Sequence, residues 1–260
     1  MMEEIVSNVW RVGGDSWGLD DLNTISADGD CNVYLLKQNS VNILIDAGTI
    51  QGQNAIENNI KECGVDPQDL SGLILTHSHY DHTQSAHQWQ KAYAVPTYLN
   101  SVGAAFLKGG DFRLVGHQSL DPNYLFNPFQ VDHACEDGQT FEVGGTTVMS
   151  HYMPGHTPDS TLFIVEHNGY RLGFCGDITF SPRPDSSGEI GWLSLLWLSN
   201  LSHYHESLTR FIDIDLDIIL AGHGHPLIGK AAIQQALEMS LATVERLRAN
   251  LDTHHFGIAT

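Results

Sequence analysis

The chain has 260 residues and is 42% hydrophobic, which supplies enough apolar surface for a full core, so we expect one domain spanning residues 1–260. Thirty-one acidic against twelve basic residues give a net charge of −19, which argues against nucleic acid or an anionic membrane as a partner. Apolar runs long enough to span a bilayer are absent, and the acidic start does not resemble a secretory signal; we expect a soluble, cytoplasmic protein.

Short apolar runs separated by turns make the first half of the chain rich in predicted strands, at residues 5–12, 31–37, 41–45, 73–75 and 95–99. Apolar positions at helical spacing predict helices over residues 54–63 and 83–91. Between Ser101 and Cys135, Gly, Pro, Asn and Asp break the pattern. We expect a long irregular excursion there, of the kind that often covers a site.

Regular patterning returns in the second half, with predicted strands at residues 139–143, 146–151, 161–166, 170–175 and 218–221. Helices are expected over residues 204–212 and 230–248, and residues 181–200 form a second irregular segment that contains tryptophans. The four cysteines are scattered and include no CxxC pair, so neither a disulfide framework nor a thiolate metal site is indicated.

One six-residue segment, His77-Ser78-His79-Tyr80-Asp81-His82, places three imidazoles and a carboxylate directly after an apolar strand. In an extended segment His77 and His79 point to the same side, whereas Asp81 and His82 begin the next helix and point elsewhere. The loop can therefore supply ligands to two metal ions. The alternative is a solvated, histidine-rich loop.

Three further candidate ligands also follow predicted strands. His156 lies in a turn between two strands, Asp177 follows a strand through Gly176, and His223 follows another through Gly222. Taken alone, they read equally well as a turn histidine, a helix cap and a loop histidine. His225 competes with His223, because either could reach a metal. Asp46 ends a strand, either as a plain turn residue or as a carboxylate that orients a metal-binding histidine.

Mixed imidazole and carboxylate ligands suit borderline cations, and a carboxylate can bridge two of them. We therefore expect two divalent metal ions, Zn²⁺ in the first place, with Fe²⁺ or Mn²⁺ as alternatives. Water bound to such a pair has its pKa lowered from about 15.7 towards about 7, which makes hydroxide available as a nucleophile. Asp81 is the candidate catalytic residue, which would orient the hydroxide or pass a proton to the leaving group.

The motifs HSHYDH, GHTPDS, FCGD and AGHGHP, together with LIDAG at Asp46, resemble in kind and order those of the metallo-β-lactamase superfamily. The resemblance implies an α/β fold, a four-layer αββα sandwich with the site at one edge. It also implies that Asp177 bridges the metals, that Asp46 supports a ligand, and that His223 is the ligand in place of His225. It implies further that His77, His79 and His156 hold the first metal. The implied ligands of the second metal are Asp81, His82 and His223.

The resulting prediction is a hydrolase that acts on a small carboxylic acyl substrate: an ester, thioester, lactone or cyclic amide such as a β-lactam. The alternatives are a mononuclear iron sulfur or persulfide dioxygenase, a phosphodiesterase of the same fold, and a non-catalytic metal-binding scaffold. The partner is a small molecule, and a homo-oligomer is left open. Aromatic residues are predicted either to wall an apolar substrate pocket or to belong to the core; they are Phe180, Trp192, Trp197 and Tyr204, with Phe106, Phe112 and Tyr124 from the excursion.

Overall fold

The structure is a computed structural model that describes residues 2–19, 22–110, 127–184 and 187–253. Within these residues the strands form two mixed sheets. The first has seven strands in the order β1-β2-β3-β4-β5-β6-β7, and the second has six in the order β13-β12-β11-β10-β9-β8. Each sheet therefore uses one half of the chain.

The first half supplies the strands β1 (Glu3–Val6), β2 (Val9–Gly13), β3 (Val33–Gln38), β4 (Val41–Ile45), β5 (Gly72–Ile74), β6 (Thr97–Asn100) and β7 (His133–Cys135). Its helices are α1 (Gln53–Glu62), α2 (Tyr80–Thr83), α3 (Ala86–Tyr93) and α4 (Ser101–Gly109). The second half supplies β8 (Thr140–Val143), β9 (Thr146–Tyr152), β10 (Thr161–His167), β11 (Tyr170–Gly176), β12 (Ile218–Ala221) and β13 (Leu227–Ile228), with helices α5 (Leu201–Ile212) and α6 (Lys230–Thr253).

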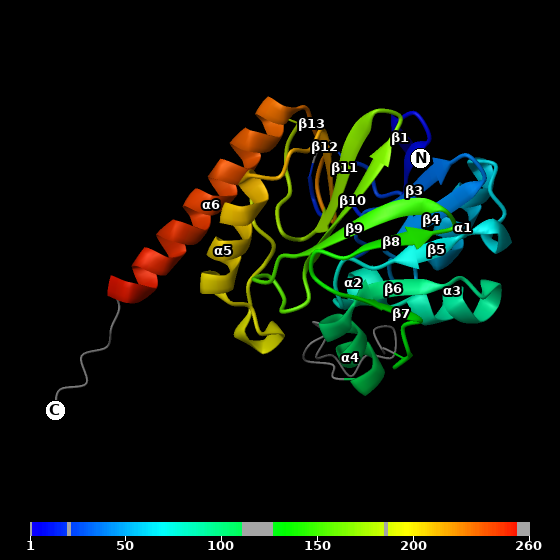
Figure 1. Cartoon of the computed structure of the whole chain (residues 1–260), viewed down its shortest axis with the longest axis horizontal. Coiled ribbons are helices and arrows are strands. Elements are labelled where there is room, and N and C mark those ends of the chain that lie inside the picture. Colours follow the sequence, from blue (N-terminus) through cyan, green and yellow to red (C-terminus); the bar gives the residue numbers. More distant parts are fainter. Residues whose placement is uncertain (1, 20–21, 111–126, 185–186, 254–260) are drawn as a thin grey trace.

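Three apolar clusters separate four layers. Alternation along β4 sends Leu44 to the cluster shared with α1 and α3, and Ile43 to the cluster between the sheets. Along β12, Ile218 faces the cluster between the sheets, whereas Ile219 packs with α5 and α6. Figure 1 shows α5 and α6 on one side of the paired sheets and α1 and α3 on the other. This is the four-layer αββα sandwich that the sequence predicted.

Residues 5–12, predicted as one strand, form a hairpin of β1 and β2 instead. The apolar alternation continues through the turn, so the pattern shows no break. Asn8 turns the chain in the left-handed region, with φ 66°, which asparagine tolerates better than most residues. The helix predicted over 83–91 is likewise divided into α2 and α3.

The segment 101–135, predicted as irregular, begins with helix α4 and ends with strand β7. Asn100 caps α4 by accepting a hydrogen bond from the Gly103 N–H (2.8 Å). The glycines in this helix suggested a broken chain. Gly103 instead allows close packing, because a Cβ there would lie 2.4 Å from Oδ2 of Asp159. Residues 111–126, including Phe112 and Tyr124, lie outside the described residues.

Two of the parallel strand pairs bring distant loops to one edge of the sandwich. β4 and β5 are parallel, so Asp46 and the loop after β5 emerge side by side. β11 and β12 are parallel as well, with Gly176 opposite Ala221, and they deliver Asp177 and His223 next to each other. Within the described ranges, no helix combines the length and apolar character needed to cross a bilayer. The single domain over residues 1–260 and the cytoplasmic location stay predictions.

Candidate metal centre

The seven predicted ligand side chains meet at this edge. His77 and His79 come from the loop between β5 and α2, and Asp81 and His82 from α2 itself. The other three come from the β9–β10 loop and from the segments after β11 and β12. Six of the seven are buried, and His223 is partly exposed. The edge therefore collects four separate stretches of chain into one largely buried polar cluster.

Asp177 lies between two groups of histidines. In the first group, His156 Nε2 is 3.0 Å from His79 Nδ1 and 3.5 Å from Asp177 Oδ2, and ligand atoms of these three residues and His77 all lie within 4.8 Å of one another. On the other side, Asp177 Oδ1 is 3.2 Å from His82 Nε2, and Asp177 Oδ2 is 3.2 Å from His223 Nε2. The sequence resemblance implied that Asp177 bridges two metals, and in the structure its carboxylate lies between the two groups of histidines.

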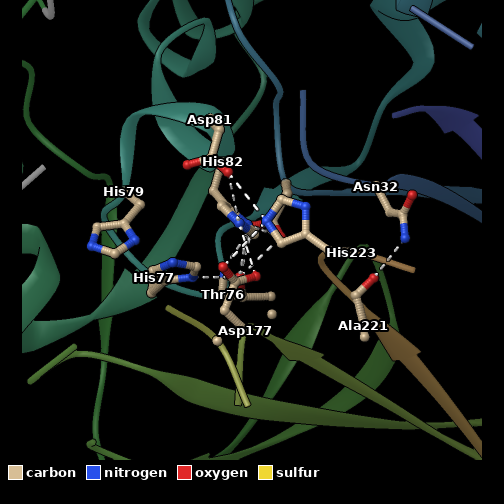
Figure 2. Close-up of polar contacts among 12 residues, drawn as sticks. Asn32, Thr76, His77, His79, Asp81, His82, Asp177, Ala221 and His223 are labelled. Carbon is tan, nitrogen blue, oxygen red and sulfur yellow. Dashed lines mark hydrogen bonds and ion pairs between the residues drawn. The ribbon is translucent and has the colours of Figure 1, made fainter. Parts of the chain in front are cut away.

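Asp81 completes the second group. Its Oδ2 lies 3.3 Å from His223 Nε2 and 3.6 Å from His82 Nε2. Figure 2 shows His82 and His223 directed at Asp177, with the Asp81 carboxylate close by. The four residues His77, His79, His156 and Asp177 could hold one cation, and Asp81, His82 and His223 a second.

Polar partners on the far side fix the orientation of the imidazoles. Asp46 Oδ2 is 2.8 Å from His82 Nδ1, and Asp46 Oδ1 accepts a hydrogen bond from the Thr76 N–H at 2.8 Å. The backbone carbonyl of Trp192 lies 2.8 Å from His156 Nδ1. Histidines that bind metals are typically held by such contacts on the second ring nitrogen. Asp46 therefore occupies the place predicted for a carboxylate that orients a ligand.

The donor set fits divalent cations. The Nε2 atoms of His77 and His79 are buried and have no hydrogen-bond partner among the described residues. A buried nitrogen left without a partner costs on the order of 1–3 kcal/mol, and coordination of a cation removes that cost. Cys31 also lies near Asp46 and His82. Burial raises the pKa of its thiol far above neutrality, so it stays a neutral thiol there.

In the first group, and at Asp177, the electrostatics favour the protonation states that metals require. At His82 and His223, by contrast, burial is outweighed by nearby carboxylates, which raise the pKa values of both rings, so each must lose a proton to bind a cation. Burial lowers the pKa of His79 to about 3 and that of His77 well below its ordinary value, so both rings are neutral at physiological pH. Burial would raise the pKa of Asp177, but His223 and His82 outweigh it and hold this pKa well below the usual range. Neutral imidazoles and an ionised carboxylate are the ligand forms that bind cations.

His223 rather than His225 reaches the cluster. The backbone of His225 pairs with Ser181, whose carbonyl accepts its N–H at 2.8 Å, and its side chain is not part of the groups that could hold a cation. His223 faces both Asp81 and Asp177. The structure thus separates two histidines that the sequence motif presented as competitors.

Two glycines let the backbone pass directly under the cluster. A Cβ added at Gly222 would lie 2.4 Å from Asp177 Oδ1 and 2.5 Å from His82 Cε1. At Gly191, a Cβ would lie 2.7 Å from His156 Nδ1. Even an alanine at either position would push against a ligand side chain.

A cavity of about 350 Å³ opens above the cluster. Its described lining includes Phe180, Trp192 and Trp197, as predicted, together with residues that the sequence did not single out: Trp17, Leu19, Tyr80, Pro182 and Glu189. The wall is predominantly aromatic and aliphatic. The cluster lies at the base of the cavity, where His79, Asp81, Asp177 and His223 contribute to its surface.

Of the residues predicted as either cavity wall or core, Tyr204 and Phe106 do not line this cavity; Phe106 lies on α4, and Tyr204 belongs to the core. Tyr204 is fully buried, and its hydroxyl donates to the backbone carbonyls of Asp177 and Ile178 (2.9 and 2.8 Å) while it accepts from the Gly191 N–H. It therefore supports the segments that carry the site from behind.

Trp17 is the main residue of the wall that the sequence did not reveal. Its ring centre is 4.7 Å from that of His223 and 5.7 Å from that of Trp192, edge to face in both cases. The available signal was a lone tryptophan in a turn-rich stretch between two predicted strands, where binding residues are common.

Residues 27–223 match the family described as the metallo-beta-lactamase superfamily. A probable polyketide biosynthesis zinc-dependent hydrolase from Bacillus velezensis is 32% identical over 117 residues, 42% of this chain and 44% of that protein. A ribonuclease from Thermus thermophilus is 24% identical over 224 residues, 80% of this chain and 50% of that protein. The chain thus spans half or less of these two curated relatives. A variant of a metallo-beta-lactamase from Cronobacter sakazakii shares the fold with TM-score 0.75 at 22% identity, covering 97% and 98% of the two chains.

Proposed function

This chain belongs to the metallo-beta-lactamase superfamily, and on that premise we propose that it is a hydrolase that uses two divalent cations to cleave a small carboxylic acyl substrate. The bond is that of an ester, thioester, lactone or cyclic amide. The observation that carries the proposal is the position of the Asp177 carboxylate between two groups of histidines, at the base of an apolar cavity.

In this proposal His77, His79 and His156 hold one cation, Asp81, His82 and His223 hold the other, and Asp177 contacts both. The imidazole and carboxylate donors favour Zn²⁺, with Fe²⁺ or Mn²⁺ as alternatives. When bound, such a pair supplies hydroxide at neutral pH and a Lewis acid for the substrate carbonyl. The protein's own part is to fix these ligands through Asp46 and through the carbonyl of Trp192.

Asp81 is the proposed proton-transfer residue. Burial would raise its pKa, but His82 and His223 outweigh it and keep the carboxyl ionised, so it can accept a proton. It also forms part of the cavity surface, where a substrate would contact it. In hydrolysis Asp81 would take up the proton of the attacking water and return it to the leaving oxygen, sulfur or nitrogen.

Two features support an acyl substrate over the alternatives. Lys and Arg are absent from the described cavity lining, and the chain carries a net charge of −19, so a phosphodiester backbone would meet no cationic side chain in that lining. A mononuclear iron oxygenase would need only the first set of ligands. It would leave Asp81, His82 and His223 without a role, although the three side chains converge within ligand distance.

Elemental analysis and a substrate panel test this proposal. We expect two zinc ions per chain, loss of activity after treatment with a strong chelator, and recovery on adding Zn²⁺. The panel should contain a thioester, a lactone, a β-lactam and bis-p-nitrophenyl phosphate, with hydrolysis of at least one of the first three. One iron per chain without acyl hydrolysis, or hydrolysis of the phosphodiester alone, would overturn the proposal.

A further inference from the structure

The cavity wall above the metal centre differs sharply from the centre in charge. Six apolar side chains form the described wall: Trp17, Leu19, Phe180, Pro182, Trp192 and Trp197. Apart from the side chains of the centre itself, the one carboxylate in the described lining is Glu189, and that lining contains no Lys or Arg. A substrate group that rests on this wall therefore meets aromatic surface and a negative charge.

Trp17 presents only apolar surface to the cavity. Its indole Nε1–H donates to the backbone carbonyl of Asp30 at 3.0 Å, so its one polar atom is already bonded. The Asp30 carboxylate in turn accepts hydrogen bonds from the Thr49 N–H (2.7 Å) and the Thr49 hydroxyl (2.5 Å). This anchoring holds the ring against His223 even though the Trp17 backbone has a left-handed φ of 50°.

Glu189 is fixed at the rim of the cavity by its backbone. Its N–H and C=O pair with the C=O and N–H of Phe180, at 2.9 and 3.0 Å, and its carbonyl also accepts a hydrogen bond from the Ser240 hydroxyl at 3.1 Å. The side chain is exposed. The backbone thus holds Glu189 in the cavity lining, where its exposed side chain carries a negative charge.

We propose that this wall selects acyl substrates whose group beside the scissile bond is apolar and uncharged, and that it discriminates against substrates carrying a second, remote anionic group. Trp17 supplies the apolar contact, and Glu189 supplies the repulsion. The proposal rests on the proposed hydrolase function and specifies the substrate class. At a distance of several ångströms in a partly solvated cavity, a like charge weakens binding by about tenfold, and added salt reduces this effect.

A pair of substrates matched in chain length tests the selection. Hexanoyl and adipoyl thioesters of N-acetylcysteamine differ at the far end, where the second carries a carboxylate. If the protein hydrolyses oxygen esters better than thioesters, the hexanoyl and adipoyl p-nitrophenyl esters are compared in the same way. We expect kcat/KM to favour the hexanoyl substrate by about tenfold or more, through KM, and 0.5 M NaCl to reduce that ratio to about threefold.

Glu189→Gln should reduce the hexanoyl to adipoyl ratio by about fivefold to tenfold, and salt should then change it little. The matched control is Glu166→Gln, which removes the same charge from an exposed side chain on β10. Glu166 lies near the end of β10 that is remote from the β9–β10 loop carrying His156. It should leave the ratio as in the unaltered protein. Equal kcat/KM values for the two substrates, or the same response to both substitutions, would overturn the proposal.

A binding measurement separates this inference from the proposed function. Hexanamide and adipic acid monoamide resist hydrolysis, and titration of tryptophan fluorescence reports their binding because three tryptophans line the cavity. The protein could bind hexanamide in preference to the monoamide, lose this preference in Glu189→Gln, and hydrolyse no acyl compound. That result would refute the proposed hydrolase function and retain the proposed selection by the wall. Hydrolysis without discrimination in either measurement would retain the hydrolase and refute the selection.

Discussion

The metal centre and the cavity wall are built in opposite ways. The side chains of the centre follow the ends of sheet strands, most are buried, and His82 and His156 are held on the far side by Asp46 and by a backbone carbonyl. The wall comes from loops, and Trp192 and Leu195 in one of them are 68% and 88% exposed. The sheets thus fix the chemistry, whereas the loops decide what is recognised.

This contrast predicts that changes in the centre alter metal content or turnover, whereas changes in the wall alter KM and leave the metal in place. The largest effect is expected for Asp177→Ala, because Asp177 contacts both groups of histidines. Metal content measured by elemental analysis should fall below one ion per chain, and kcat should fall by on the order of 10³-fold or more. Two retained ions with activity within tenfold of the unaltered protein would contradict the bridging role.

Asp81→Asn should separate proton transfer from metal binding. The amide keeps the size of the side chain and one oxygen, so we expect metal content to be largely retained. Turnover should fall by about 10²- to 10⁴-fold because the variant has no carboxylate to accept a proton. Full activity in a variant with both metals would refute the catalytic role of Asp81.

Asp46→Asn tests the support behind the centre. Asp46 lies 2.8 Å from His82 Nδ1 and does not reach the cavity. Loss of such a partner typically reduces metal affinity by about 10- to 100-fold. Competition with a zinc-binding dye should show this loss, and excess Zn²⁺ should restore most of the activity. Failure of excess Zn²⁺ to restore activity would mean that Asp46 does more than orient His82.

Trp17→Ala examines the wall. Removing the ring deletes apolar contact with the substrate but no ligand, so KM should rise by about tenfold while metal content and kcat stay close to those of the unaltered protein. Trp17→Phe, which retains an aromatic ring, should recover most of the affinity. Loss of metal from Trp17→Ala would show that wall and centre are not separable.

The smallest expected effect is the number of protons released when the centre binds metal. In the metal-free centre, burial lowers the pKa of His223, but Asp177 and Asp81 outweigh it and raise this pKa to about 9. The ring is therefore protonated below pH 9 and must lose its proton to bind a cation. Calorimetry in buffers of different ionisation enthalpy should show release of about one proton or more per chain at pH 7, with metal affinity rising as pH increases towards 9. Trp17→Ala should not change this count.

The same division explains how far the sequence alone could reach. The ligands could be predicted because each follows an apolar strand in a short polar motif, and because parallel strands bring their carboxyl ends to one edge. The residues of the cavity wall do not follow a comparable sequence pattern. Trp17 comes from a loop that is held by a hydrogen bond to the Asp30 carbonyl. Tyr204 lies in the apolar cluster that packs with α5 and α6, and its aromatic character alone does not distinguish that place from the cavity wall. Helix α4 was missed because one of its glycines, Gly103, allows close packing against Asp159 and does not break the helix.

The glycines under the centre bear on how this scaffold can diversify. Any side chain at Gly222 or Gly191 would collide with Asp177, His82 or His156, so neither position can be varied without rebuilding the site. Residues 17–19 and 195–198 lie outside the set of predicted ligands, and Trp17, Leu19 and Trp197 among them line the cavity. A library of variants meant to change substrate preference should concentrate on those two stretches and keep both glycines. Each variant would then retain the centre and differ only in the substrates that its cavity binds.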